Sequence, residues 1–262
     1  MSDPVLLKRI EAVATITMNR PDRRNALTVE LKNALLGALR QVGSDPRVRC
    51  VVLTGSGDGF CVGQDLGEHA ELMERDPASV FSTVAEHYVP IVELITGMPK
   101  PVVAAVNGTC VGAGLGFALA CDLRVFADDA TLGTAFSGVG LTCDSGLSAT
   151  LPRSVGEARA RELILLGRTF SPDDAVSWGI TGQVVPRSEV ADTAAGLAEE
   201  LALGPTAAYA ESKRLLREGL ESSLTEALVA ETAAQNRCGQ TQDHRSAVRS
   251  FLARERPTFT GQ

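Results

Sequence analysis

The chain has 262 residues, of which 44% are hydrophobic and 22% charged, and its 25 Lys and Arg against 32 Asp and Glu give a net charge of −7. This composition is typical of a folded protein large enough to bury a full core, and it excludes wholesale disorder. The acidic balance excludes a general nucleic-acid binder and disfavours an anionic membrane surface, because both partners require clustered Lys and Arg.

The cysteines and the first residues indicate a cytoplasmic protein. None of the six cysteines forms a Cys-x-x-Cys pair, and no histidine lies at ligand spacing from one, so we expect no zinc ribbon, no haem attachment and no metal site. Scattered cysteines in a chain of this length are typical of reduced core thiols. The acidic N-terminus lacks an apolar run, which predicts no secretory signal.

Predicted strands and helices alternate over the first half of the chain. Residues 13–18 are β-branched and predict a strand, while 49–54 and 102–106 are apolar runs typical of strands covered on both faces. Thr28 is the expected N-cap of a helix whose apolar residues, from Leu31 to Val42, recur with helical spacing. Helices are also predicted at 64–73, 80–95 and 113–120, and a strand at 123–127. This alternation indicates an α/β fold with crossover connections.

The stretch 101–121 carries no charge and is long enough for a membrane span. Pro101, Asn107 and four glycines within it favour a buried strand, turn and helix instead. We therefore expect no membrane-spanning segment.

The character of the chain changes after about residue 190, where Ala, Leu, Glu and Arg dominate. Helices are predicted at 206–219, 222–238 and 243–254. We divide the chain into an α/β core, residues 1–200, and a C-terminal helical region, residues 201–262.

Two glycine-bearing turns, residues 59–66 and 107–114, each lead from a predicted buried strand into a helix. Helix N-termini present unpaired N–H groups, and two such turns facing each other can place two donors on one acyl oxygen. The alternative is that both turns serve only close packing. Other chemistry has weaker support: the three histidines, His69, His87 and His244, have no motif partner, and a dinucleotide fingerprint starting at Gly112 fails at Phe117.

At these turns the sequence resembles the enoyl-CoA hydratase/isomerase (crotonase) superfamily. The resemblance runs in order along essentially the whole chain, through residues 19–21, 25–27, 59–66, 99–108, 120–122, 138–141 and 251–257. It implies a crotonase-like ββα superhelical core with a C-terminal helical trimerisation region, and a homotrimer or a hexamer built as a dimer of trimers.

The resemblance also implies the site. The oxyanion-hole amides would come from Gln64 and Ala113. Coenzyme A enters as part of the thioester substrate, with no tightly bound cofactor, and its adenine and ribose lie near five residues: Arg24, Ala26, Val62, Gln64 and Leu66. The C-terminal helix of a neighbouring subunit would add contacts from Phe251 and Arg254.

Departures from the family pattern decide the expected chemistry. Aligned by motif, the two glutamates of family hydratases are replaced by Gly116 and Phe136, neither of which transfers a proton. Each such acid is commonly worth about 10²–10⁴-fold in rate, so a standard hydratase is rejected. The remaining carboxylate, Asp144, aligns with the acidic residue of some family isomerases, and residues 147–153 and 257–261 resemble the ring-epoxide isomerase subgroup of bacterial phenylacetyl-CoA degradation.

Asp144 has two interpretations that can both hold: a base in an apolar pocket near Phe136, Val139 and Leu141, which would raise its pKa, or the N-cap of a helix beginning near residue 145. Asp65 is predicted to cap the helix that follows it. Glu68 and His69 could reach an acyl pocket, but charge on a short helix is usually solvated.

Three functions remain open. The first is an acyl-CoA isomerase that shifts a double bond or opens a ring epoxide through a stabilised enolate. The second is a hydratase-like enzyme with a replacement acid. The third is a non-catalytic acyl-CoA binder of the same family.

Overall fold

The computed structural model describes residues 3–262. Residues 1 and 2, which belong to the start for which no secretory signal is predicted, lie outside the described residues. The larger of two sheets has the order β1-β2-β3-β5-β7-β10. Its strands are β1 (Val5–Ile10), β2 (Val13–Met18), β3 (Cys50–Gly55), β5 (Val102–Val106), β7 (Leu123–Ala127) and β10 (Gln183–Val185).

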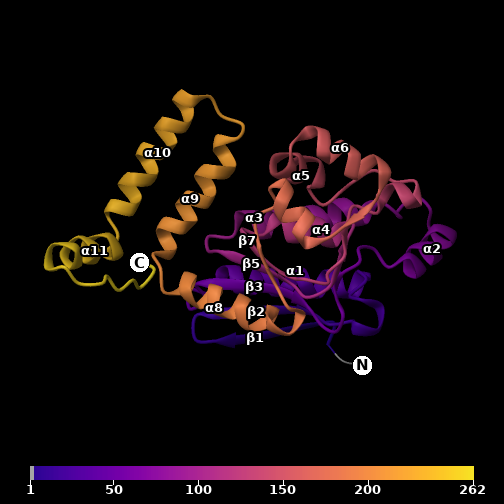
Figure 1. The fold of residues 1–262 in the computed structure, drawn as a ribbon, viewed down its shortest axis with the longest axis horizontal. Coiled ribbons are helices and arrows are strands. Elements are labelled where there is room, and N and C mark those ends of the chain that lie inside the picture. The colour runs from indigo at the N-terminus through magenta and orange to yellow at the C-terminus, as the bar shows by residue number, and fades with distance from the viewer. Residues whose placement is uncertain (1–2) are drawn as a thin grey trace.

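Strand pairing in the larger sheet is parallel except at one edge. β1, which the sequence pattern did not predict, pairs antiparallel with β2. β2 pairs with β3, β3 with β5, β5 with β7 and β7 with β10 in parallel. Every residue of β5 is buried, which confirms the prediction from its apolar run. Helix α8 (Val190–Ala202) packs against β2, β3, β5 and β7, and Figure 1 shows it beside β2.

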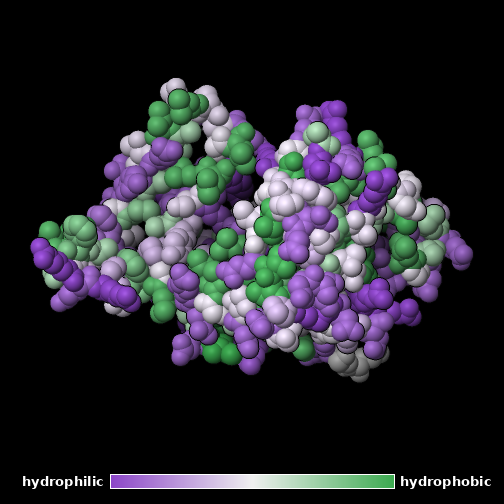
Figure 2. Space-filling view, in the orientation of Figure 1, coloured by the Kyte–Doolittle hydropathy of each residue, from purple (hydrophilic) through white to green (hydrophobic). Residues whose placement is uncertain are grey.

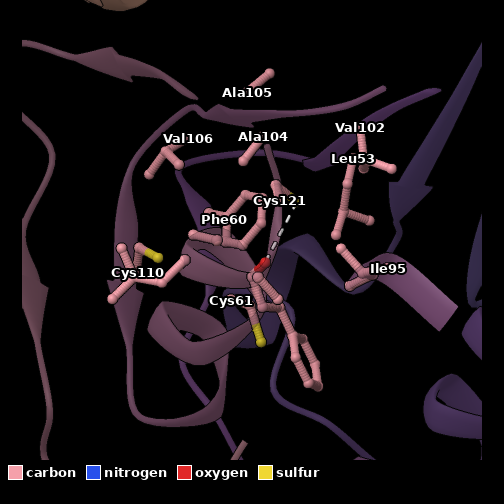
Figure 3. Packing of buried hydrophobic residues seen from close by; sticks show 14 of the residues in the cluster. Leu53, Phe60, Cys61, Ile95, Val102, Ala104, Ala105, Val106, Cys110 and Cys121 are labelled. Atoms are coloured by element: carbon pink, nitrogen blue, oxygen red, sulfur yellow. Dashed lines mark hydrogen bonds between the residues drawn. The ribbon is translucent and has the colours of Figure 1, made fainter. Parts of the chain in front are cut away.

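The smaller sheet carries the turns of interest. Its order is β4-β6-β8-β9, and its strands are β4 (Gly59–Cys61), β6 (Thr109–Val111), β8 (Leu132–Gly133) and β9 (Thr169–Phe170). Figure 3 shows Phe60, Cys61 and Cys110 packed beneath β5, near Ala104 and Val106, and all five side chains are fully buried. One continuous apolar core therefore fixes the two turns against the larger sheet.

Two helices of the core, α1 and α4, follow the predicted bounds closely. α1 spans Val29–Ser44, with the Thr28 hydroxyl accepting from the Leu31 amide as its N-cap, and α4 spans Ala113–Ala120 as expected. The remaining core helices are α2 (Leu66–Arg75), α3 (Val89–Gly97), α5 (Leu147–Val155), α6 (Glu157–Leu166) and α7 (Pro172–Trp178). Short helical turns are η1 (Pro21–Arg23), η2 (Val84–Tyr88), η3 (Phe136–Val139) and η4 (Arg187–Glu189).

The prediction of one regular α-helix over residues 80–95 is wrong, because part of this range is π-helical. A π-helical turn, η2, leads into α3, and the Val89 amide donates to the carbonyl of Val84, five residues back. Pro90 explains the wider turn, because it has no N–H to donate and its ring would clash with the carbonyl four residues earlier.

Three C-terminal helices extend away from the core: α9 (Thr206–Gly219), α10 (Leu224–Gly239) and α11 (Gln242–Ala253). Lys213 of α9 anchors them through an ion pair of 2.7 Å to Asp122. Figure 2 shows apolar surface gathered over α9 and α10, where Leu216, Leu220 and Leu224 are largely exposed.

Within residues 3–262, no helix combines the length and the apolar character that crossing a membrane would require. The uncharged stretch 101–121 folds as β5, β6 and α4, which confirms the buried strand, turn and helix.

Candidate active site

The first turn leaves one main-chain amide unpaired. After β4, the chain runs beside Leu27, whose amide donates to the carbonyl of Gly63 (2.8 Å) and whose carbonyl accepts from the amide of Asp65 (3.1 Å). Alternate residues of an extended chain point to opposite sides, so the amide of Gln64 faces away from Leu27. Among residues 3–262 it has no acceptor.

The second turn presents another free amide at the start of α4. Gly112, at φ +58°, donates its own amide to Gly133 (3.0 Å) and turns the chain from β6 into the helix. Ala113 is the first helical residue, so its amide has no intrahelical acceptor, and no other acceptor lies within the described part of the chain.

The two turns touch each other. A methyl group placed on Gly63 would lie 3.5 Å from the Ala113 nitrogen. Gly114 makes this approach possible, because any side chain there would overlap the carbonyl of Cys61 in β4. The turns that carry Gln64 and Ala113 therefore lie side by side, and the shared role of their amides in an oxyanion hole stays a prediction.

Gln64 and Ala113 both line a cavity of about 340 Å³. Its wall is mainly apolar and contains three aromatic side chains, Phe81, Tyr88 and Phe136. The polar side chains that reach it are few, and Asp144 is the only carboxylate among the described residues lining it. The remaining lining residues are Val62, Gly63, Gln64, Leu66, His69, Met73, Gly112, Ala113, Thr134, Ala135, Val139 and Leu141.

Asp144 is half-buried on this wall. Burial raises the pKa of its carboxyl above the usual range, although the Ser145 hydroxyl, which donates to Oδ1 at 2.7 Å, partly opposes the shift. Phe136, Val139 and Leu141 share the cavity, as expected. The alternative N-cap role is wrong: α5 begins at Leu147, its N-cap is Gly146, and no side chain caps it.

A buried polar cluster behind Gln64 was not predicted. Lys32 of α1 is fully buried, and its ammonium donates to Gln64 Oε1 (3.1 Å) and to Thr83 Oγ1 (2.5 Å). The Tyr88 hydroxyl donates to the same Gln64 oxygen at 2.5 Å, and Thr83 also contacts the Nδ1 atom of buried His87 at 3.2 Å. A signal existed in the sequence, because Lys32 lies three and four residues before Leu35 and Leu36 on the buried face.

Of the residues expected near coenzyme A, some reach the cavity and others do not. Val62, Gln64 and Leu66 line it. Arg24 and Ala26 lie beside the first turn and outside the lining: Arg24 packs against Gly59, and the Ala26 carbonyl accepts from Arg20.

Phe251 and Arg254 lie far from the cavity within one chain. Phe251 is 81% exposed on α11, and Arg254 ends that helix at φ +60°. Figure 1 places α11 at the opposite end of the molecule from α2, which lines the cavity. A single chain does not bring these two residues to the site.

Asp65, Glu68 and His69 lie at the start of α2 and make different contacts. Asp65 accepts from the amides of Gly67 (3.0 Å) and Glu68 (3.1 Å), so its predicted N-cap role is confirmed. The Glu68 carboxylate accepts a hydrogen bond from the Val29 amide at 2.9 Å. His69 does line the cavity, packing edge-on to Phe81 with ring centroids 5.7 Å apart. Of the two interpretations given for His69, the structure therefore agrees with the one in which it reaches the cavity.

Comparison with known proteins assigns this arrangement to a family. Residues 8–262 match the enoyl-CoA hydratase/isomerase profile. The chain belongs to the enoyl-CoA hydratase/isomerase family. Members of this family act on CoA thioesters, and the predicted crotonase-like fold is confirmed by structural neighbours.

Individual relatives of this family carry both activity names. The chain is 39% identical over 258 residues, 98% of each protein, to 1,2-epoxyphenylacetyl-CoA isomerase of Escherichia coli (strain K12). It is 37% identical over 252 residues, 96% of each protein, to a Rhodobacter capsulatus protein named a probable enoyl-CoA hydratase. A crystal structure described as an enoyl-CoA hydratase/isomerase from Mycobacterium abscessus superposes with a TM-score of 0.95 at 46% identity, covering 98% of this chain and 100% of that one.

The structure explains why this family member cannot hold a glutamate at residue 116. A Cβ atom on Gly116 would lie 2.5 Å from the Cβ of Ser145 and 2.7 Å from its carbonyl oxygen. The space that a longer side chain would need is thus filled by the backbone that carries Asp144. Phe136 fills the other position with a buried ring on the cavity wall.

Proposed function

We propose that the protein is an acyl-CoA isomerase that uses Asp144 as its acid and base. The observation that carries this proposal is the composition of the cavity: two unpaired amides on one side and a single half-buried carboxylate. Adding water to a double bond requires an activated water and a proton donor, whereas moving a double bond requires one group that takes a proton and returns it.

The chemistry balances without any other reactant. The thioester oxygen accepts hydrogen bonds from the amides of Gln64 and Ala113. The ionised Asp144 removes a proton from the α or γ carbon, and the electron pair of that C–H bond moves through the conjugated system onto the thioester oxygen. The two amides stabilise this enolate. Asp144 then returns the proton to another carbon of the same system, and the carbonyl re-forms.

The raised pKa of Asp144 supports this role. A carboxylate of ordinary acidity is a weak base towards carbon, and burial in an apolar wall strengthens it. Phe81, Tyr88 and Phe136 make the wall suitable for a flat, unsaturated or cyclic acyl group. The name of the Escherichia coli relative, an isomerase of 1,2-epoxyphenylacetyl-CoA, supports a substrate of this kind and a role in phenylacetate catabolism.

A second candidate, hydration with a replacement acid, is favoured by one observation. His69 lines the same cavity as Asp144, and an imidazole can both accept and donate a proton. An imidazole on this wall can supply the second proton carrier, which is lost where Gly116 and Phe136 replace the two glutamates of family hydratases. The probable hydratase from Rhodobacter capsulatus supports this candidate by name.

Binding of coenzyme A completes the proposal. We infer that Arg24, Ala26, Val62 and Leu66 flank the adenine and ribose, beside the turn that carries Gln64. We also infer a cytoplasmic homotrimer or hexamer in which Phe251 and Arg254 of one subunit reach the coenzyme A of the next. The 81% exposure of Phe251 and the 77% exposure of Leu252 support a partner surface on α11.

The deciding experiment compares Asp144→Asn with the exposed-surface control Asp173→Asn on a panel of unsaturated straight-chain and phenylacetyl-derived CoA thioesters. Isomers are separated chromatographically, and the reaction runs in ¹⁸O-labelled water. Asp144→Asn should abolish mass-neutral conversion and retain thioester binding, while Asp173→Asn should match the wild type.

Three results would redirect the assignment. Label at the β carbon of the product identifies hydration. Turnover retained in Asp144→Asn refutes the proposed mechanism. Tight thioester binding by the wild type without turnover of any member of the panel identifies an acyl-CoA binder.

A further inference from the structure

Lys32 is a buried cation with no carboxylate partner. Its side chain is fully buried, and it takes part in none of the ion pairs formed within residues 3–262. Burying an ammonium is costly unless it is hydrogen-bonded, and the packing of α1 does not require a charge at this position. The function of the Lys32 charge is therefore inferred from the two acceptors that it contacts, Gln64 Oε1 and Thr83 Oγ1.

Both acceptors belong to the walls of the site. Gln64 supplies one of the two unpaired amides, and Thr83 lines a recess beside the main cavity that also includes Asp144. The Gln64 side-chain oxygen accepts a second hydrogen bond, from Tyr88, whose ring lies 5.6 Å from the Lys32 nitrogen. The side chain of Gln64 is thus held by two donors from two elements, α1 and η2.

These contacts complete the positioning of the Gln64 amide. Leu27 fixes the main chain on either side of residue 64, and Lys32 and Tyr88 fix its side chain. A displacement of about 1 Å in such a donor can cost about 10²-fold in rate. The ammonium also places a buried positive charge on the side chain of the residue that supplies one oxyanion-hole amide, and charges interact more strongly in a buried site than in water.

We propose that Lys32 is a positioning residue for the oxyanion hole, which holds the Gln64 turn and adds its charge to the stabilisation of the enolate. This inference rests on the proposed function of Gln64 and Ala113. It couples the π-helical turn η2 to the first glycine turn, since Lys32 bridges Gln64 and Thr83 directly.

The groups that face Lys32 set the pH at which it loses its charge. Burial lowers its pKa below that of an exposed lysine, and Glu68 of α2 and Glu86 of η2 partly oppose this. On η2, burial and then the nearby Lys32 lower the pKa of His87, so that imidazole tends to be neutral. Burial raises the pKa of the Tyr88 hydroxyl, so it stays a donor. Turnover should therefore fall on the alkaline side as Lys32 deprotonates.

The test compares Lys32→Met with Lys100→Met. Lys100 is a matched control because it is also buried, donates to the carbonyls of Val42 and Asp45 at 2.9 Å, and lines no part of the cavity. Lys32→Met should lower kcat about 10- to 100-fold, change KM less than kcat, and remove the alkaline fall in kcat. Lys100→Met should lose stability and keep both the kcat and the pH profile of the wild type.

A readout without turnover separates this inference from the proposed function. The carbonyl band of a bound, unreactive acyl-CoA reports polarisation by the two amides, and it should move back towards the free value in Lys32→Met. If the wild type shows this band shift but turns over no substrate, the isomerase proposal fails. The positioning role of Lys32 is then still tested by the band shift in Lys32→Met.

Tyr88→Phe keeps the inference testable if Lys32→Met does not fold. It removes the other donor to Gln64 Oε1 with little change of shape, and we expect a several-fold loss of kcat with a smaller band shift. A folded Lys32→Met with wild-type kcat and an unmoved band overturns the inference, as does an equal loss of kcat in Lys100→Met. If only Tyr88→Phe folds, wild-type kcat and band in that variant overturn it.

Discussion

Gly116 offers a direct test of how the fold presents Asp144. We consider the substitution Gly116→Ala in α4, where the added methyl would lie 2.5 Å from the Cβ atom of Ser145 and 2.7 Å from its carbonyl oxygen. Ordinary contacts at these positions are longer by about 1 Å or more, and part of the neighbour is backbone. Residues 144 and 145 must therefore move away from α4 if the methyl is to fit.

The magnitude follows from a comparison with Gly196→Ala in α8. Both glycines lie inside helices, so alanine gains about 0.5–1 kcal/mol in each through its better helix propensity. A Cβ at Gly196 meets no atom of the described residues within 4 Å, whereas overpacking of a tight contact costs about 1–3 kcal/mol. The free energies of unfolding of the two variants should differ by about 1–3 kcal/mol, with Gly196→Ala the more stable.

The kcat of Gly116→Ala should fall because Asp144 is displaced. A shift of about 1 Å at Asp144 is expected to lower kcat by about 10²-fold in Gly116→Ala, with Gly196→Ala unchanged. Urea unfolding gives the free energies, and steady-state turnover of the CoA thioester found in the substrate panel gives kcat. If Gly116→Ala is as stable and as active as Gly196→Ala, the close contact does not position Asp144, and the reasoning is refuted.

Further predictions concern charge and cysteine reactivity. Because the pKa of Asp144 is raised in the folded state, the wild type should lose stability as pH rises from the ordinary aspartate value through the raised one; Asp144→Asn should lack this fall and be more stable at pH 7 by urea unfolding. The ionised Asp144 is the base, so kcat of the wild type should drop on the acid side at a pH above about 4, the ordinary aspartate pKa. Burial acts to raise the pKa of Asp65, but the hydrogen bonds that its carboxylate accepts outweigh burial and lower the pKa. The stability that Asp65 adds is therefore present above the ordinary aspartate pKa and is lost as pH falls through the lowered pKa. Asp65→Ala should cost about 1–2 kcal/mol in the free energy of unfolding and raise KM. A thiol reagent at pH 8 should modify half-exposed Cys143, with protection by bound acyl-CoA, and leave Cys61, whose pKa burial raises to about 12, unmodified until the chain unfolds; mass spectrometry of the labelled peptides checks both.

Much of the fold could be predicted because its elements are strongly patterned. The bounds of β2, β5 and α4 match the predicted ranges because apolar runs there report burial, and those of α9 match because its residues favour a helix. The edge strand β1 was missed because all but its first residue are exposed, and the short strands of the smaller sheet have too few residues for a periodic pattern. The assignment of residues 1–200 and 201–262 to separate regions stays a prediction.

The site was only partly predictable. The glycines showed that two turns between strands and helices could face each other, and the family resemblance then named Gln64 and Ala113 as the residues of the pair. Lys32 was missed, and the interpretation in which His69 reaches the acyl pocket was given the lower weight, for a different reason. A single charged or titratable residue on a helix is usually solvated, and only the packing of η2 and α2 against α1 shows that these two face inward.

The segment that carries Asp144 shows why its position could not be derived from periodicity. Two non-glycine residues of this segment adopt left-handed backbone, Ala135 at φ +61° and Ser145 at φ +51°, each at a cost of about 1–3 kcal/mol. Such strain persists only where packing fixes it. Here the Thr134 hydroxyl donates to the Leu163 carbonyl at 2.9 Å at one end, and Ser145 contacts Gly116 at the other. The absence of a side chain at Gly116 and the inward placement of Asp144 are therefore one structural feature, because a glutamate at residue 116 would occupy the volume through which the chain brings Asp144 to the cavity.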